Sequence, residues 1–220
     1  MPKSQVKKTT AKPFERLPRG RHNLSREEVE SSQRERIMRA MSEAVGELGY
    51  NKATVAEVLK RAGVSRETFY AQFTDKHDCF MASFEQAADE MVRRITAAVE
   101  QVESTGGSKE EQISMILASF LGLVADEPAI ARTFYVEVYA AGQDAIEHRV
   151  EIQMRTVELI MGVLDVRPQD RFAIQATLAA IGAIVTQVVS LGQAENAVHL
   201  QPELLKFVLA ALRGLDSNLV

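Results

Sequence analysis

Residues 54–73 read TVAEVLKRAGVSRETFYAQF, and this stretch decides the fold. Thr54 has the side chain and the position of a helix N-cap, and Gly63 suits the left-handed residue that ends a helix. Ser65 can cap a second helix at once, in which two phenylalanines four residues apart share a buried face. Two short helices joined by a glycine-centred turn form a helix-turn-helix.

The second helix leaves one polar face for a partner. Once its phenylalanines are buried, the other face presents Ser65, Arg66, Glu67, Thr68, Tyr70 and Gln72. Arg66 can bind O6 and N7 of guanine together, whereas Thr54, Tyr70 and Lys76 suit phosphate contacts. The pattern predicts a helix that reads DNA; the alternative is a helical hairpin with a solvated polar face.

A basic arm precedes this motif. Residues 1–24 contain seven lysines and arginines against one acid, with little apolar periodicity, which is typical of a disordered segment. Within it, Arg19 and Arg21 flank a glycine and can lie in a narrow A·T-rich minor groove, much as in the AT-hook. A solubilising tail held near DNA by charge alone is the alternative.

Charge and composition divide the chain in a similar way. Residues 1–80 carry 16 Lys+Arg against 11 Asp+Glu, whereas residues 81–220 carry 10 against 19, which indicates a polyanion-binding part joined to a part that does not touch the polyanion. With 46% hydrophobic and 25% charged residues, disorder along the whole length is excluded. The single cysteine and the absence of a secretory signal pattern favour the cytoplasm.

Helix signals extend over nearly the whole chain, and no proline lies between Pro18 and Pro128. We therefore expect an all-α protein without strands. Beyond the helix that begins at Ser25 and the motif itself, the expected helices cover residues 74–102, 109–125, 128–140, 143–164, 169–191 and 202–214.

Residues 33–80, with the motif at their centre, resemble the DNA-binding part of the tetracycline-repressor (TetR) family of bacterial regulators. Leu59, where the family has a small alanine, and Glu67, where glycine is frequent, depart from its pattern. The resemblance implies three parts: an arm over residues 1–24, a three-helix DNA-binding domain over 25–80, and a helical bundle over 81–220 that binds a ligand and dimerises. Its further implication is an inducer, a small and largely apolar molecule that acts on a homodimer bound to a palindromic operator.

The stretch between Arg171 and Glu195 has no charged residue. Its length raises the possibility of a membrane span, but polar residues are spread through it and no basic cluster flanks it, so no membrane is expected. Its small residues allow a close helix–helix contact, and the final helix adds an apolar face with Leu204, Leu205, Val208 and Leu212. Both helices favour a homodimer interface; a helix buried within one chain is the alternative.

The middle helices carry aromatic and methionine residues at helical spacing, which more often form plain core than a binding cavity. The resemblance favours a cavity, for which the candidate ligand-binding residues are Met115, Phe120, Phe134, Tyr135, Tyr139, Met154, Arg155, Thr177 and Gln187.

No catalytic or metal-binding motif is found. The chain lacks the nucleophile-elbow and phosphate-loop spacings, and its four histidines lie far apart. We expect no enzymatic activity, no cofactor and no metal. The sequence therefore predicts a ligand-responsive transcriptional regulator, in the first instance a repressor, with a non-sequence-specific architectural DNA-binding protein as the alternative.

Overall fold

A computed structural model describes residues 25–104 and 106–213, and every element in these ranges is a helix. The all-α prediction is confirmed, and no strand occurs in this part of the chain. The expected arm, with Arg19 and Arg21, lies outside the described residues.

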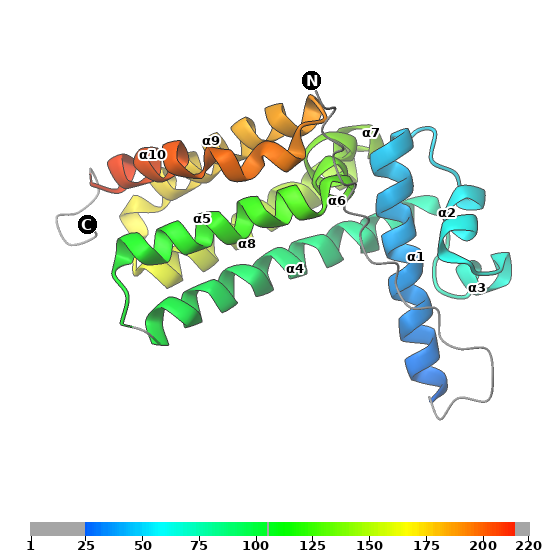
Figure 1. The fold of residues 1–220 in the computed structure, drawn as a ribbon. Coiled ribbons are helices and arrows are strands. Elements are labelled where there is room, and N and C mark those ends of the chain that lie inside the picture. The colour runs from blue at the N-terminus through cyan, green and yellow to red at the C-terminus, as the bar shows by residue number, and fades with distance from the viewer. Residues whose placement is uncertain (1–24, 105, 214–220) are drawn as a thin grey trace, which may run out of the picture.

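Three helices form a small domain at one end of the molecule (Figure 1): α1 (Arg26–Leu48), α2 (Val55–Ala62) and α3 (Arg66–Tyr70). Helix α1 packs against α2 and against the start of α4 (Lys76–Ser104). Phe69, Phe73 and Phe80 are almost wholly buried between them. Their burial fixes how the short helices lie on α1.

Helix α4 leaves this domain and runs into an elongated bundle that makes up the rest of the molecule (Figure 1). The long bundle helices are α5 (Lys109–Asp126), α8 (Gln143–Leu164), α9 (Arg171–Ser190) and α10 (Gln201–Arg213). Two 3₁₀ segments, η2 (Pro168–Asp170) and η3 (Ala194–Leu200), precede α9 and α10. The second of these was not expected from the sequence.

Between the domain and the bundle, the single helix expected over 128–140 is divided into three. Helix α6 (Pro128–Arg132) passes into a π-helical segment, η1 (Thr133–Glu137), and then into α7 (Val138–Ala141). Helix α6 packs closely on α1 at Gly46, where the absence of a side chain allows the contact. A Cβ on Gly46 would lie only 2.7 Å from the Cα of Ala129. This segment is therefore the contact between the bundle and the small domain.

The apolar face expected on the last helix does not face outward as the dimer prediction required. Leu204, Val208 and Leu212 are buried in their own chain, where α10 packs on α5 and α9. Helix α9 is different, because Phe172 and Leu191 are 78% and 67% exposed. By length and composition alone the segment Pro168–Ser190 could cross a membrane, with 28% of its most apolar window buried.

Candidate DNA-binding face and ligand cavity

The helix-turn-helix is held by the local signals that its sequence contains. The Thr54 hydroxyl accepts a hydrogen bond of 3.3 Å from the amide of Glu57, and the Ser65 hydroxyl accepts one of 3.0 Å from the amide of Thr68. Gly63 has φ 65° and ψ 40°, the left-handed conformation expected of it. The reciprocal bond of a full capping box is absent at Thr54, because the Glu57 carboxylate lies near Arg61 instead.

These caps orient a polar surface, which we call the recognition face: Ser65, Arg66, Glu67 and Tyr70, all exposed, and the partly buried Thr68. Arg66 forms no ion pair with any described residue, so its guanidinium is available to a base edge. Tyr70 is 48% exposed, while its ring packs edge-on against Phe69. The structure thus brings five of the predicted DNA-binding residues together at the outer end of the small domain.

Lys76, also predicted to bind DNA, differs from the residues of the recognition face because its side chain is bonded within the protein. Its Nζ donates a 2.8 Å hydrogen bond to the carbonyl oxygen of Tyr50 and lies 4.0 Å from the centroid of the Tyr50 ring. Burial lowers the pKa of this ammonium group. Lys76 therefore ties α4 to the end of α1, and a phosphate would have to bind an ammonium already engaged in the fold.

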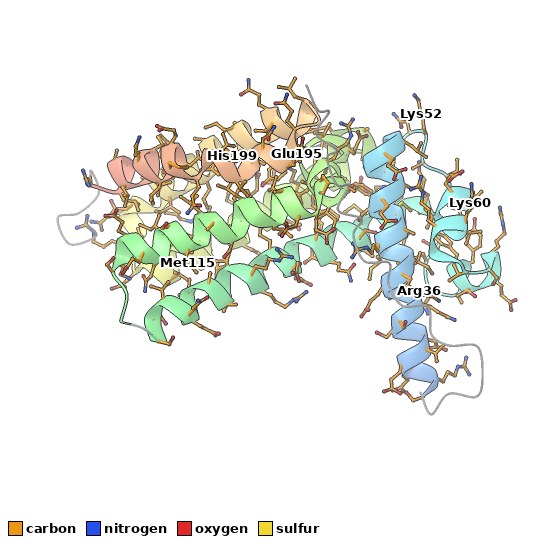
Figure 2. The ribbon with its side chains drawn as sticks, in the orientation of Figure 1. Arg36, Lys52, Lys60, Met115, Glu195 and His199 are labelled. Carbon is orange, nitrogen blue, oxygen red and sulfur yellow. The ribbon has the colours of Figure 1, made fainter. Side chains whose placement is uncertain are left out.

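Three other basic side chains extend from the small domain and were not singled out by the sequence. Figure 2 shows Arg36, Lys52 and Lys60 there, and both lysines are exposed. Arg34, in contrast, donates a 2.8 Å hydrogen bond to the carbonyl oxygen of Gln72 and stacks on Phe73. Lysines without local partners suit phosphates, whereas Arg34 supports the motif from behind.

A cavity of about 150 Å³ lies inside the bundle between α4, α5, η1, α8 and α9. No charged side chain lines it. Its polar groups come from Tyr135, Gln153, Thr156 and Gln175, and the remaining walls are apolar. A space of this kind suits an apolar ligand oriented by a few hydrogen bonds.

The predicted ligand-binding residues separate into two groups. Phe120, Phe134, Tyr135 and Met154 line this cavity, and Thr177 lines a smaller one beside it. The others lie elsewhere: Tyr139 is 55% exposed, Gln187 is exposed, and Arg155 forms an ion pair with Glu85 at 2.7 Å. Met115 lies on α5 outside the cavity walls (Figure 2).

Glu137, which the sequence did not reveal as important, joins the bundle to the small domain. This almost buried carboxylate accepts a 2.9 Å hydrogen bond from the amide of Tyr50 and pairs with Arg132 at 3.0 Å. Its own segment, η1, supplies Phe134 and Tyr135 to the cavity wall. Cavity and small domain are therefore separated by a single π-helical turn, a feature that is often found at functional sites.

The Tyr50 side chain strengthens the same contact. Its hydroxyl lies 3.0 Å from Nδ1 of His77, and Nε2 of His77 lies 2.6 Å from Oδ2 of Asp144 on α8. The hydrogen bond to His77 lowers the pKa of the Asp144 carboxyl. These contacts link the turn after α1 with α4, η1 and α8. We call the group that makes them the junction: Glu137, Tyr50, His77 and Asp144.

A family model described as bacterial regulatory proteins of the tetR family matches residues 37–82, which contain the whole recognition face. The DNA-binding part of the chain is therefore of the TetR type. Its relatives include a fatty acid metabolism regulator protein of Bacillus subtilis, 21% identical over 59% of this chain and 61% of that protein. The transcriptional activator FasR of Mycolicibacterium smegmatis is 21% identical over 84% of this chain and 82% of its own.

The likeness to solved structures extends beyond the DNA-binding part and over the bundle. The regulator FadR from Bacillus subtilis, solved in complex with stearoyl-CoA, covers 80% of this chain and 98% of its own with a TM-score of 0.70. At 21% identity this likeness shows a shared fold. The first curated relative is matched over less than two thirds of its length, and the relatives named here are regulators.

Proposed function

We propose that this chain is a ligand-responsive, sequence-specific transcriptional regulator. It acts in the cytoplasm as a homodimer that represses from a palindromic operator and is released by a small, largely apolar inducer. The observation that carries the proposal is an element shared by two sites. The π-helical segment η1 contributes to the wall of an apolar cavity and also contacts α1, which supports the recognition face.

The DNA contacts divide by chemistry. Arg66 and Glu67 reach base edges, where arginine selects guanine and a carboxylate accepts from the amino group of cytosine. Phosphates are met by Thr54, Tyr70, Lys52, Lys76 and the basic arm, which position the domain without reading sequence. Two such domains in a dimer enter major grooves about 34–36 Å apart, or a multiple of that distance.

The inducer acts by shifting a population of conformations. A molecule in the cavity favours the state in which η1 and α4 hold the two recognition faces out of register with the operator. Its difference in affinity for the two states sets the largest loss of DNA binding that it can cause. Stearoyl-CoA, bound by the Bacillus subtilis FadR structure, is the first molecule to try.

Selection of bound sequences from a random double-stranded DNA pool at near-physiological salt tests the DNA-binding part. We expect a palindrome with two equal half-sites. Enrichment of A·T-rich DNA without symmetry would instead establish the architectural alternative. The selected operator then serves to measure affinity with and without stearoyl-CoA, and unchanged binding at saturating ligand would refute the coupling by this ligand while leaving DNA binding intact.

A further inference from the structure

Arg149 on α8 is unlike the other arginines of the bundle. Between residues 76 and 190 every other described arginine pairs with a carboxylate, namely Arg93, Arg94, Arg132, Arg155, Arg167 and Arg171. Arg149 has no such partner among the described residues, and its Nε is buried without a hydrogen bond. The side chain is partly buried, and its Nε is a hydrogen-bond donor that an anionic acceptor would satisfy.

The position of Arg149 relates it to the cavity. Residues 149, 152, 153, 156 and 160 share one face of α8 by their three- and four-residue spacing, and the last four of these line the cavity. The guanidinium lies 5.8 Å and 5.9 Å from the ring centroids of Phe134 and Tyr135, which form the adjoining wall. On its outer side it lies 5.5 Å from the ring centroid of the exposed Tyr139. Arg149 therefore continues the cavity face by one turn and stands at its end nearest the small domain.

The cavity itself continues in the opposite direction. A second space of about 50 Å³ shares Ile116, Leu117 and Ile160 with it and reaches Leu164 and Leu212 at the far end of the bundle. From Arg149 to Leu164, α8 rises about 22 Å at 1.5 Å per residue. Both spaces have mainly apolar walls without a charged side chain, and the unbranched Met91 and Met154 can rearrange to widen the first.

We propose that Arg149 binds the anionic group of an amphipathic ligand whose long hydrocarbon chain occupies these two adjoining cavities. A carboxylate or a phosphate meets the Arg149 fork, and the Tyr135 hydroxyl, which bonds to no described residue, supplies a second donor beside it. The chain runs past Gln153 and Ile160 toward Leu164. This inference rests on the proposed function for the cavity, and it adds the charge and the orientation of the ligand.

The test measures ligand binding by calorimetry on the full chain without DNA. The probes are tetradecanoate, tetradecanoyl-CoA and 1-tetradecanol, which share one chain and differ in head group. The variants are Arg149→Gln and, as a matched control, Arg155→Gln, which removes an arginine already paired with Glu85. Melting curves of both variants establish that they are folded.

For at least one of the two anionic probes, we expect Arg149→Gln to weaken binding by about ten- to a hundredfold, the loss of one charge-assisted hydrogen bond. Binding of the alcohol should change by less than about threefold, and Arg155→Gln should leave all probes nearly unchanged. If only tetradecanoate binds, the head group that Arg149 recognises is a carboxylate. If only tetradecanoyl-CoA binds, it is a phosphate. Equal weakening of all three probes by Arg149→Gln, no weakening, or failure of every probe to bind the unaltered chain would overturn the proposal. Because no DNA is present, a failed operator selection leaves this result unaffected.

Discussion

At the scale of single residues, Arg66 and Lys76 differ in the bonds that their side chains already form within the protein. Arg66 is exposed and unpaired among the described residues, whereas Lys76 is bonded to the Tyr50 carbonyl. A free guanidinium on the recognition face can discriminate between bases. An ammonium fixed to the backbone contributes charge to the site and stability to the fold.

Arg66→Ala should therefore remove base discrimination at one operator position. The expected change is about 1–3 kcal/mol at that position, since one bidentate contact is lost. Competition between the selected operator and variants changed one base pair at a time measures it. If affinity for operator and for random DNA falls by the same factor, Arg66 does not read a base.

Lys76→Ala should weaken binding to every sequence alike and reduce the slope of log affinity against log salt by about one. It should also lower the melting temperature, because the Tyr50 carbonyl loses its donor. Lys52→Ala is the control for the effect on stability, since Lys52 is an exposed lysine of the same domain whose side chain bonds to no described residue. It should reduce the salt slope but leave the melting temperature unchanged. An unchanged melting temperature for Lys76→Ala would show that its bond to Tyr50 adds no stability.

Cys79 should be inert in the folded protein. It is fully buried, and burial raises the pKa of its thiol to about 12. Because the thiolate is the reactive form, a disulfide exchange reagent at pH 8 should label almost none of the native protein and one thiol per chain after unfolding. Rapid labelling of the native chain would contradict this packing role and would make Cys79 a candidate redox site.

At the scale of elements, η1 is the segment through which the bundle and the small domain meet. Glu137→Ala leaves the buried Tyr50 amide and the Arg132 guanidinium without their shared acceptor. The expected loss is about 1–3 kcal/mol in the free energy of unfolding, together with a smaller effect of any inducer on operator affinity. Denaturant unfolding and operator titrations with and without ligand measure the two effects.

Glu137→Gln is the control for this prediction, because its amide oxygen can still accept from Tyr50 while its charge is lost. Its free energy of unfolding, and the effect of inducer on its operator affinity, should both lie between those of the unaltered chain and those of Glu137→Ala. If Glu137→Ala unfolds less readily than the unaltered chain, or responds to inducer normally, the junction does not couple the two parts.

Sequence patterns predicted those elements whose causes are local. The caps at Thr54 and Ser65 and the left-handed Gly63 act within three or four residues, so the helix-turn-helix could be derived almost to its boundaries. The π-helical turn could not, since 128–140 has an ordinary helical pattern and the distortion accompanies the hydrogen bond of Glu137 with Tyr50, after the end of α1. A contact between buried residues that are distant in the sequence does not alter the local spacing of apolar residues, so that spacing cannot predict it.

The cavity was predicted only in part for the same reason. Aromatic and methionine side chains at helical spacing identify a buried face, and four of them do line the cavity. Polar residues cannot be assigned to a face without knowing how the helices pack. Gln153 and Gln175 line the cavity, for example, while Gln187 on the same α9 helix as Gln175 is exposed.

At the scale of the whole molecule, α9 has an outer face without a partner in its own chain. Phe172, Ala176, Ala183 and Leu191 recur there at helical spacing and are exposed. On α10, in contrast, Phe207 is 43% exposed but Leu204, Val208 and Leu212 are buried inside the chain. Small residues beside large apolar ones allow a second helix to approach closely. We therefore assign the proposed homodimer chiefly to α9, a narrower interface than the two helices expected from the sequence.

Ala183→Glu should convert the dimer to a monomer, because a carboxylate at the centre of this face would be buried against its own symmetry copy without a counter-ion. Ala97→Glu places the same charge on an exposed position of α4 and should leave the dimer intact. Sedimentation equilibrium distinguishes these outcomes directly. Because the variant no longer dimerises, its affinity for the palindromic operator should fall. Its affinity for an isolated half-site should not change, since each recognition face remains folded. Retention of the dimer by Ala183→Glu would place the interface on another surface.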